Sequence, residues 1–218
     1  MDEVLRIVIP LAAGAAVSPA VLTLQLVTLS GGVSPRARSW AIAAGYTAVL
    51  AGLSVVGLLL AASTGGSDTP SETEAAVKLA AAVVLAVLGV RILTRPPKAP
   101  TDHGEADSEP HLGRHAAIGG VLMITNVTTA VLYIPAIHDA GVADISTADK
   151  AAAIALVLAI TSIPAVAPPL AVTLLGQRAQ GGLTKLNGFT TRHKRAIDAG
   201  ICFAFSAFLA AVSLPHLL

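Results

Sequence analysis

The chain has 218 residues, of which 54% are hydrophobic and only 12% are charged, and its formal net charge is +1. Soluble proteins carry about 25% charged residues, so this chain has too little polar surface to cover a water-soluble globule of its size. The small net charge predicts no nucleic-acid partner. We therefore expect an all-α integral membrane protein, neither a soluble domain nor an enzyme of recognisable kind.

Six apolar stretches are long enough, or nearly so, to cross a bilayer as helices. A hydrocarbon core about 30 Å thick requires about 20 apolar residues in a helix. The stretches cover residues 4–29, 40–62, 75–93, 116–137, 151–176 and 196–217. Continuous apolarity without alternation favours helices over barrel strands. The first stretch follows an acidic start and exceeds the length of a signal-peptide core, so we expect it to be retained.

Lysine and arginine are unevenly distributed among the loops. Of the 14 Lys and Arg residues, eleven lie in or beside the loops after the first, third and fifth stretches, whereas Arg6, Lys78 and Lys150 lie on the opposite side. Loops rich in Lys and Arg remain in the cytoplasm. The sequence therefore predicts a multi-pass membrane protein with both termini on the non-cytoplasmic side.

Residues 94–114 differ in composition from their surroundings. This segment contains four prolines and four acidic residues, which predicts a flexible cytoplasmic linker. It separates a first three-helix half, residues 1–93, from a second, residues 115–218. An odd number of helices per half places the halves in opposite orientations, so related halves would form a 3+3 inverted repeat, as in many alternating-access transporters. Residues 16–22 and 124–132 both place small polar groups in mid-helix, which weakly supports such a relation.

Prolines and small polar residues interrupt the first, fourth and fifth stretches near their middles. Pro19 lacks an amide hydrogen and frees the carbonyl of Ala15, four residues earlier. Such interruptions often mark binding sites, because freed backbone groups need partners. Alternatively, hydroxyls bond their own helix and prolines only kink it. The fourth stretch holds Thr125, Asn126, Thr128 and Thr129, and the fifth holds Thr161, Ser162, Pro164, Pro168 and Pro169. We predict a substrate-binding cavity formed by Ser18, Pro19, Thr23, Gln25, Thr125, Asn126 and Thr128.

Charged residues near the cytoplasmic ends suggest two further roles. A basic rim is predicted at Arg36, Arg38, Lys194 and Arg195, together with Lys185 and Arg192. It either sets orientation and attracts anionic headgroups, or recruits an anionic substrate. Asp198 either pairs with Lys194 and Arg195 on the helix surface or acts as a coupling carboxylate.

Residues that commonly bind metals give little signal in this chain. Cys202 is the single cysteine, so it forms no internal disulfide and is best interpreted as a buried, inert thiol. The spacing of His103, His111 and His115 fits no compact metal site. His138 and Asp139 are interpreted as an interfacial pair. We expect neither a metal nor a cofactor.

Two segments resemble a known family of exporters. Ser18-Pro19, a glycine-rich turn and "SPRARSWAIAAGY" (34–46), followed later by "IGGVLMITNVTTAVLYIPAI" (118–137), are similar to the LysE-type exporter superfamily, in particular its GAP branch of glycolipid-addressing proteins. The resemblance implies six membrane helices and export, or assistance in export, of a small molecule or amphipathic lipid. It also implies a functional set comprising Ser18, Pro19, Arg36, Gly45 and Asn126. The family often has proline after this asparagine; Val127 here argues against an unwound helix.

Together with the resemblance, these features predict a membrane exporter or flippase-like carrier in a bacterial plasma (inner) membrane. It would move a small molecule or amphipathic (glyco)lipid by alternating access. The alternative is a non-transporting membrane subunit or scaffold of a lipid-export or cell-envelope machine, in which the mid-helix polar groups hold helices together. The expected partners are membrane lipids and the cargo. A homodimer could form through the small residues Gly52, Gly57 and Ala61.

Overall fold

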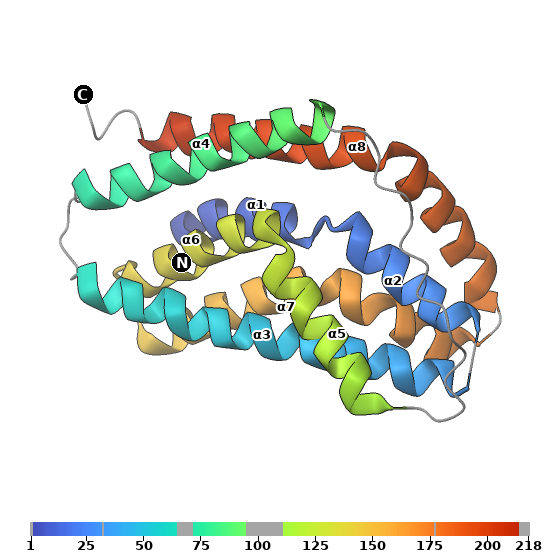
Figure 1. Cartoon of the computed structure of the whole chain (residues 1–218). Coiled ribbons are helices and arrows are strands. Elements are labelled where there is room, and N and C mark those ends of the chain that lie inside the picture. Colours follow the sequence, from blue (N-terminus) through green and yellow to red (C-terminus); the bar gives the residue numbers. More distant parts are fainter. Residues whose placement is uncertain (1, 32, 65–71, 95–110, 177, 214–218) are drawn as a thin grey trace.

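A computed structural model describes residues 2–31, 33–64, 72–94, 111–176 and 178–213 (Figure 1). Within these ranges the chain forms eight helices: α1 (Asp2–Ala16), α2 (Pro19–Ser30), α3 (Pro35–Thr64), α4 (Glu72–Thr94), α5 (Leu112–Thr125), α6 (Val127–Val142), α7 (Thr147–Leu175) and α8 (Arg178–Ser213). Most of the predicted linker, residues 95–110, lies outside the described residues. Its predicted last residues instead begin α5.

Two of the predicted spans are broken helices. The first stretch divides into α1 and α2, which are bent by 49°, and the fourth divides into α5 and α6, which are bent by 77°. Pro19 is the first residue of α2, where its missing amide costs no helical hydrogen bond. The expectation that Val127 would keep the fourth stretch continuous is wrong. Asn126 starts a new helix without a proline, because its side chain accepts a hydrogen bond from the Thr129 amide as an N-cap.

The described helices support part of the predicted membrane topology. By length and hydropathy, α3 and α7 can each cross a membrane, and each bent pair can do so if it counts as one span, which gives two to four candidate spans among the described residues. The apolar part of α4, Leu79–Thr94, is shorter. Large apolar side chains are exposed on the outer surface, as expected for helices that face lipid; they include Val27, Leu59, Val121, Ile124 and Leu174.

Helices from both halves of the chain pack together. Figure 1 shows α1 beside α6 in the middle, with α3 and α7 on one side and the α4–α8 pair on the other. The fully buried core includes Tyr46, Leu50, Tyr133 and Ile137. The α4 and α8 helices run antiparallel: Ser206 donates to the Ala82 carbonyl near the middle of α4, while Arg195, earlier in α8, donates to carbonyls at the C-terminal end of α4.

Glycines allow the backbones of α3 and α5 to touch. A Cβ on Gly45 would collide with the carbonyl oxygen of Ala116, and a Cβ on Gly119 would collide with that of Ile42. Small residues permit such close approach between membrane helices. Gly45, which the family resemblance marks as functional, therefore has a clear packing role.

The small residues predicted to form a homodimer face are partly used inside the chain. A Cβ on Gly57 would lie 2.8 Å from Ile137 of α6, and one on Gly141 would lie 2.8 Å from Ala61. Gly57 and Ala61 thus pack against α6 of their own chain. Of the three residues, Gly52 keeps open space around it.

Candidate functional site

The two helix breaks meet inside the molecule. The side-chain amide of Asn126 donates a hydrogen bond to the Ser18 hydroxyl, with 2.9 Å between Nδ2 and Oγ. Ser18 is buried in an extended conformation (φ −131°, ψ 92°), whereas Asn126 is half-buried. The structure therefore brings together the mid-span polar groups that the sequence identifies in the first and fourth stretches.

Thr129 of α6 binds the carbonyl that Pro19 frees in α1. Its hydroxyl donates to the Ala15 oxygen at 3.0 Å, and its backbone amide donates to the side chain of Asn126 at 3.4 Å. A buried carbonyl without a partner would be costly in a membrane, and this contact removes that cost. The polar cluster in the sequence includes Thr129, but the predicted binding set omits it.

Tyr46 of α3 directs another polar group toward the crossing of the broken helices. The residue is fully buried, and its hydroxyl lies near that of Thr129. Among the described residues, the Tyr46 oxygen has no hydrogen-bond partner within bonding geometry. On the same side of α6, the Tyr133 hydroxyl is hydrogen bonded to Ser54 at 2.7 Å. Sequence reasoning missed Tyr46, because a lone aromatic residue in an apolar stretch resembles core.

Four helix ends converge at this crossing, and they determine its electrostatic character. The N-terminal ends of α2 and α6 present partial positive charge, and the C-terminal ends of α1 and α5 present partial negative charge. The sequence has no Asp, Glu, Lys or Arg at residues 7–35 or 116–137. The crossing thus combines hydroxyl, amide and backbone dipoles, which suit polar groups of a ligand.

Gln25 lies farther along α2 and joins three helices. Its Nε2 donates to the carbonyls of Ala165 at 2.7 Å and Ser39 at 3.3 Å, and its Oε1 accepts from the Ser39 hydroxyl. The Ala165 carbonyl is the one that Pro169 leaves without its helical donor. Within the structure, the polar atoms of Gln25 therefore serve helix packing between α2, α3 and α7.

The three predicted threonines do not converge on one point. Thr125 is exposed, and its hydroxyl donates to Val121 and Leu122 of its own helix at 2.9 and 3.1 Å. This is the local bonding that the sequence left open as an alternative. Thr23 is half-buried in α2. Thr128 is half-buried, and its hydroxyl lies near the buried Cys202 of α8.

Two members of the predicted basic rim cap helix ends. Arg38 donates through Nη2 to the Gly31 carbonyl at 2.9 Å, just after α2. Arg195 donates to the carbonyls of Ile92 and Leu93, near the end of α4. Cations interact favourably with such C-terminal carbonyls. Arg36 and Lys194 are exposed.

The carboxylate of Asp198 is half-buried one helical turn before Cys202. It interacts electrostatically with Lys194, one of the two cations that the surface-pair alternative names. Because Cys202 is adjacent to Thr128, this face of α8 approaches the beginning of α6.

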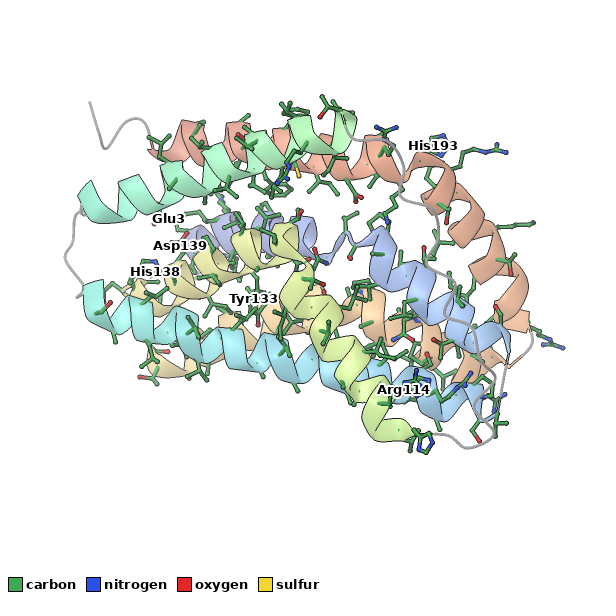
Figure 2. The ribbon with its side chains drawn as sticks, in the orientation of Figure 1. Glu3, Arg114, Tyr133, His138, Asp139 and His193 are labelled. Carbon is green, nitrogen blue, oxygen red and sulfur yellow. The ribbon has the colours of Figure 1, made fainter. Side chains whose placement is uncertain are left out.

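Potential metal ligands are dispersed in the part of the chain that the structure describes. No group of three or more His, Cys, Asp or Glu residues there could hold a metal ion. The ring of His115 contacts the backbone of His111 one turn earlier, at 3.0 Å, and His103 lies outside the described residues. His138 and Asp139 lie 3.4 Å apart, at the end of the molecule where Glu3 is found (Figure 2).

Comparison with known proteins identifies a family for nearly the whole chain. The family model described as "Sap, sulfolipid-1-addressing protein" matches residues 8–215. No curated protein and no solved structure matches the chain. The match includes both helix breaks, all of α2, α5 and α6, and α1 from residue 8 onward. It agrees with the resemblance to glycolipid-addressing proteins. The chain therefore belongs to the sulfolipid-1-addressing protein (Sap) family.

Proposed function

We propose that the chain is an exporter or flippase-like carrier that moves an amphipathic, oxygen-rich lipid across a bacterial inner membrane. The observation that carries this proposal is the contact between Ser18 and Asn126 at the crossing of two broken helices. Broken helices that meet within a membrane present polar backbone ends to a substrate. The family description, which refers to addressing of a sulfolipid, supports a lipid cargo. The proposal is of a carrier and not of an enzyme.

The surroundings of the two breaks favour a lipid over a water-soluble cargo. Val17 beside the first break is 44% exposed, and Ile124 and Val127 beside the second are 67% and 46% exposed. Apolar side chains exposed in mid-span face acyl chains. A lipid headgroup can therefore approach Asn126 from the side while its tails remain in the bilayer. The N-terminal ends of α2 and α6, with the hydroxyl of Tyr46, supply donors for headgroup oxygens.

We also propose that the chain crosses the membrane six times as an inverted repeat, with both termini outside. Each half contains a broken helix, then a long helix of 30 or 29 residues, then a helix of the α4–α8 pair. The asymmetric distribution of Lys and Arg supports the orientation. The same organisation would be compatible with the LysE-type superfamily.

A matching contact follows the broken helix in each half. Arg38 is the fourth residue after Ser34, and it donates to the carbonyl of Gly31 at 2.9 Å. Lys150 is the fourth residue after Ser146, and it donates to the carbonyl of Gly141 at 2.9 Å. In both cases a cation in the first turn of the long helix reaches back to a glycine near the end of the broken one. This recurrence supports common descent of the halves.

Transport would proceed by movement of one half relative to the other. The bonds from Asn126 to Ser18 and from Thr129 to Ala15 both join the halves, so they must rearrange when access changes sides. Asp198 is the candidate coupling group, because its half-buried face of α8 approaches α6.

The alternative is a non-transporting subunit or scaffold of a lipid-export machine. The packing role of Gln25 and the backbone contact at Gly45 favour a rigid body over a moving one. Transport by the purified protein distinguishes the two functions, since a carrier moves lipid without partners.

The test uses purified protein in liposomes that contain a fluorescent anionic glycolipid, with an impermeant quencher to report the outer-leaflet fraction. The carrier should move the lipid between leaflets, and Asn126→Ala and Ser18→Ala should abolish movement while the protein remains folded. Thr125→Ala is the matched control, because this neighbouring hydroxyl bonds only carbonyls of its own helix in the structure. Normal rates in both site variants would contradict the site, and an inactive parent protein would support the scaffold.

A further inference from the structure

The first half of α8 differs in direction from the other long helices. The whole helix has 36 residues, so at 1.5 Å per residue it is about 54 Å long, well beyond a hydrocarbon core of about 30 Å. Figure 1 shows that it runs beside α4 and then curves across the ends of α2 and α7. If α3 and α7 cross the membrane, this curved segment, residues 178–195, lies along the membrane surface.

One face of this segment is fixed to the protein. Ala179 is buried, and it packs with Leu29 of α2 and Val172 of α7 in a small apolar cluster. Leu183, one turn later, packs against the same cluster. The segment is therefore held at the ends of two membrane helices and cannot rotate freely.

The outward face combines cations with exposed apolar side chains. Arg178, Lys185 and Arg192 are all exposed, and their seven-residue spacing places them in one line along the helix. Phe189 lies four residues after Lys185 and three before Arg192, and it is 60% exposed; the neighbouring Leu186 is 45% exposed. Figure 2 shows His193 on the outer side of the same segment. Residues 150–197 contain no Asp or Glu, so nothing on this segment offsets its positive charge.

We propose that residues 178–195 form a membrane-surface helix that binds anionic phospholipid headgroups through Arg178, Lys185 and Arg192. Phe189 and Leu186 enter the boundary between headgroups and acyl chains beside the cations. An amphipathic helix with Lys and Arg above its apolar side chains has the composition of such surface helices. Because the segment lies at the ends of membrane helices, its cations are at the depth of the headgroups. This position favours anionic lipid over an acidic protein as the binding partner. This surface is independent of the transported cargo.

The test places a single tryptophan in the segment. Phe189→Trp in a Trp40→Phe background leaves one tryptophan in the chain. The full-length protein is reconstituted in mixed phosphatidylcholine and phosphatidylglycerol vesicles in which one lipid or the other carries bromine, which quenches nearby tryptophan. Brominated phosphatidylglycerol should quench more strongly than brominated phosphatidylcholine at equal mole fraction, and the preference should decrease with salt. Equal quenching by both lipids, or quenching by neither, would overturn the proposal.

Two charge variants then test whether the three cations cause the stronger quenching by phosphatidylglycerol. Substitution of Arg178, Lys185 and Arg192 by Gln should bring the two quenching efficiencies to equality, since each cation near an anionic surface changes lipid partitioning by roughly fivefold. The matched control replaces Arg6, Arg91 and Arg114 by Gln, which removes the same charge from exposed positions elsewhere. The control should retain the preference. If both variants lose the phosphatidylglycerol preference equally, the effect comes from net charge, and the three cations of this segment are not its specific cause.

Discussion

The hydroxyl of Thr129 in α6 donates to the carbonyl oxygen of Ala15 in α1, at 3.0 Å, across the crossing of the two broken helices. Thr129→Val removes this donor and keeps the shape of the side chain. The Ala15 oxygen then stays buried without a partner, which should lower the free energy of unfolding by about 1–3 kcal/mol. Denaturant unfolding in detergent micelles measures the change. Thr129→Ser keeps a hydroxyl and should retain most of the stability, whereas equal losses in both variants would contradict a hydrogen-bond role.

Gln25 and Pro169 should be energetically coupled. Gln25→Leu leaves the Ala165 carbonyl without its donor, and we expect a loss of about 1–3 kcal/mol. Pro169→Ala restores a backbone amide inside α7, at the position that ordinarily donates to Ala165. In the Pro169→Ala background, Gln25→Leu should therefore cost less. A double-mutant cycle of unfolding free energies measures this coupling; strictly additive effects would show that the side chain does not replace the missing amide.

Gly45 and Gly52 lie in the same helix and should respond oppositely to alanine. Gly45→Ala introduces a methyl group against the backbone of α5, so we expect destabilisation of about 1–3 kcal/mol or more from overpacking. Gly52 has open space around it, and Gly52→Ala should be neutral or stabilise by up to about 1 kcal/mol through helix propensity. Thermal unfolding of the two variants checks the contrast. A tolerated Gly45→Ala would mean that α3 and α5 are not in backbone contact.

The Tyr46→Phe variant should distinguish a role of this residue in cargo binding from a role in helix packing. Tyr46→Phe removes a buried hydroxyl that has no hydrogen-bond partner among the described residues, so stability should be unchanged or slightly increased. If the hydroxyl donates to a headgroup at the crossing, the variant should move lipid in liposomes about tenfold more slowly. This corresponds to a rise of roughly 1.4 kcal/mol in the activation free energy. Unaltered transport together with unaltered stability would remove Tyr46 from the site. Lower stability would indicate a partner within the protein.

The sequence indicated which residues interrupt the apolar stretches, but it did not indicate their neighbours on other helices. The mid-span positions of Ser18 and Asn126 follow from their place in apolar stretches, and the structure joins them. The carbonyl that Pro19 frees is likewise fixed by helix geometry. Which side chain would bind that carbonyl depends on the packing of α1 against α6, and sequence spacing does not reveal this packing. Thr129 and Tyr46 were therefore missed as members of one cluster.

The break at Asn126 shows a second limit. Proline is the common cause of an interrupted helix, and its absence after Asn126 favoured continuity. Asparagine can end one helix and cap the next with its own side chain. Composition also predicted six spans, whereas the described helices support two to four.

The carbonyls freed by Pro19 and Pro169 have consequences for how the chain is made. Each carbonyl accepts a hydrogen bond from the other half: Thr129 donates to Ala15, and Gln25 donates to Ala165. During synthesis, the helices of the first half, α1 to α4, are made before α6, so the Ala15 oxygen lacks this partner until α6 follows. The finished architecture thus depends on late assembly of both halves, and either half expressed alone would keep a polar defect that only its complement can repair.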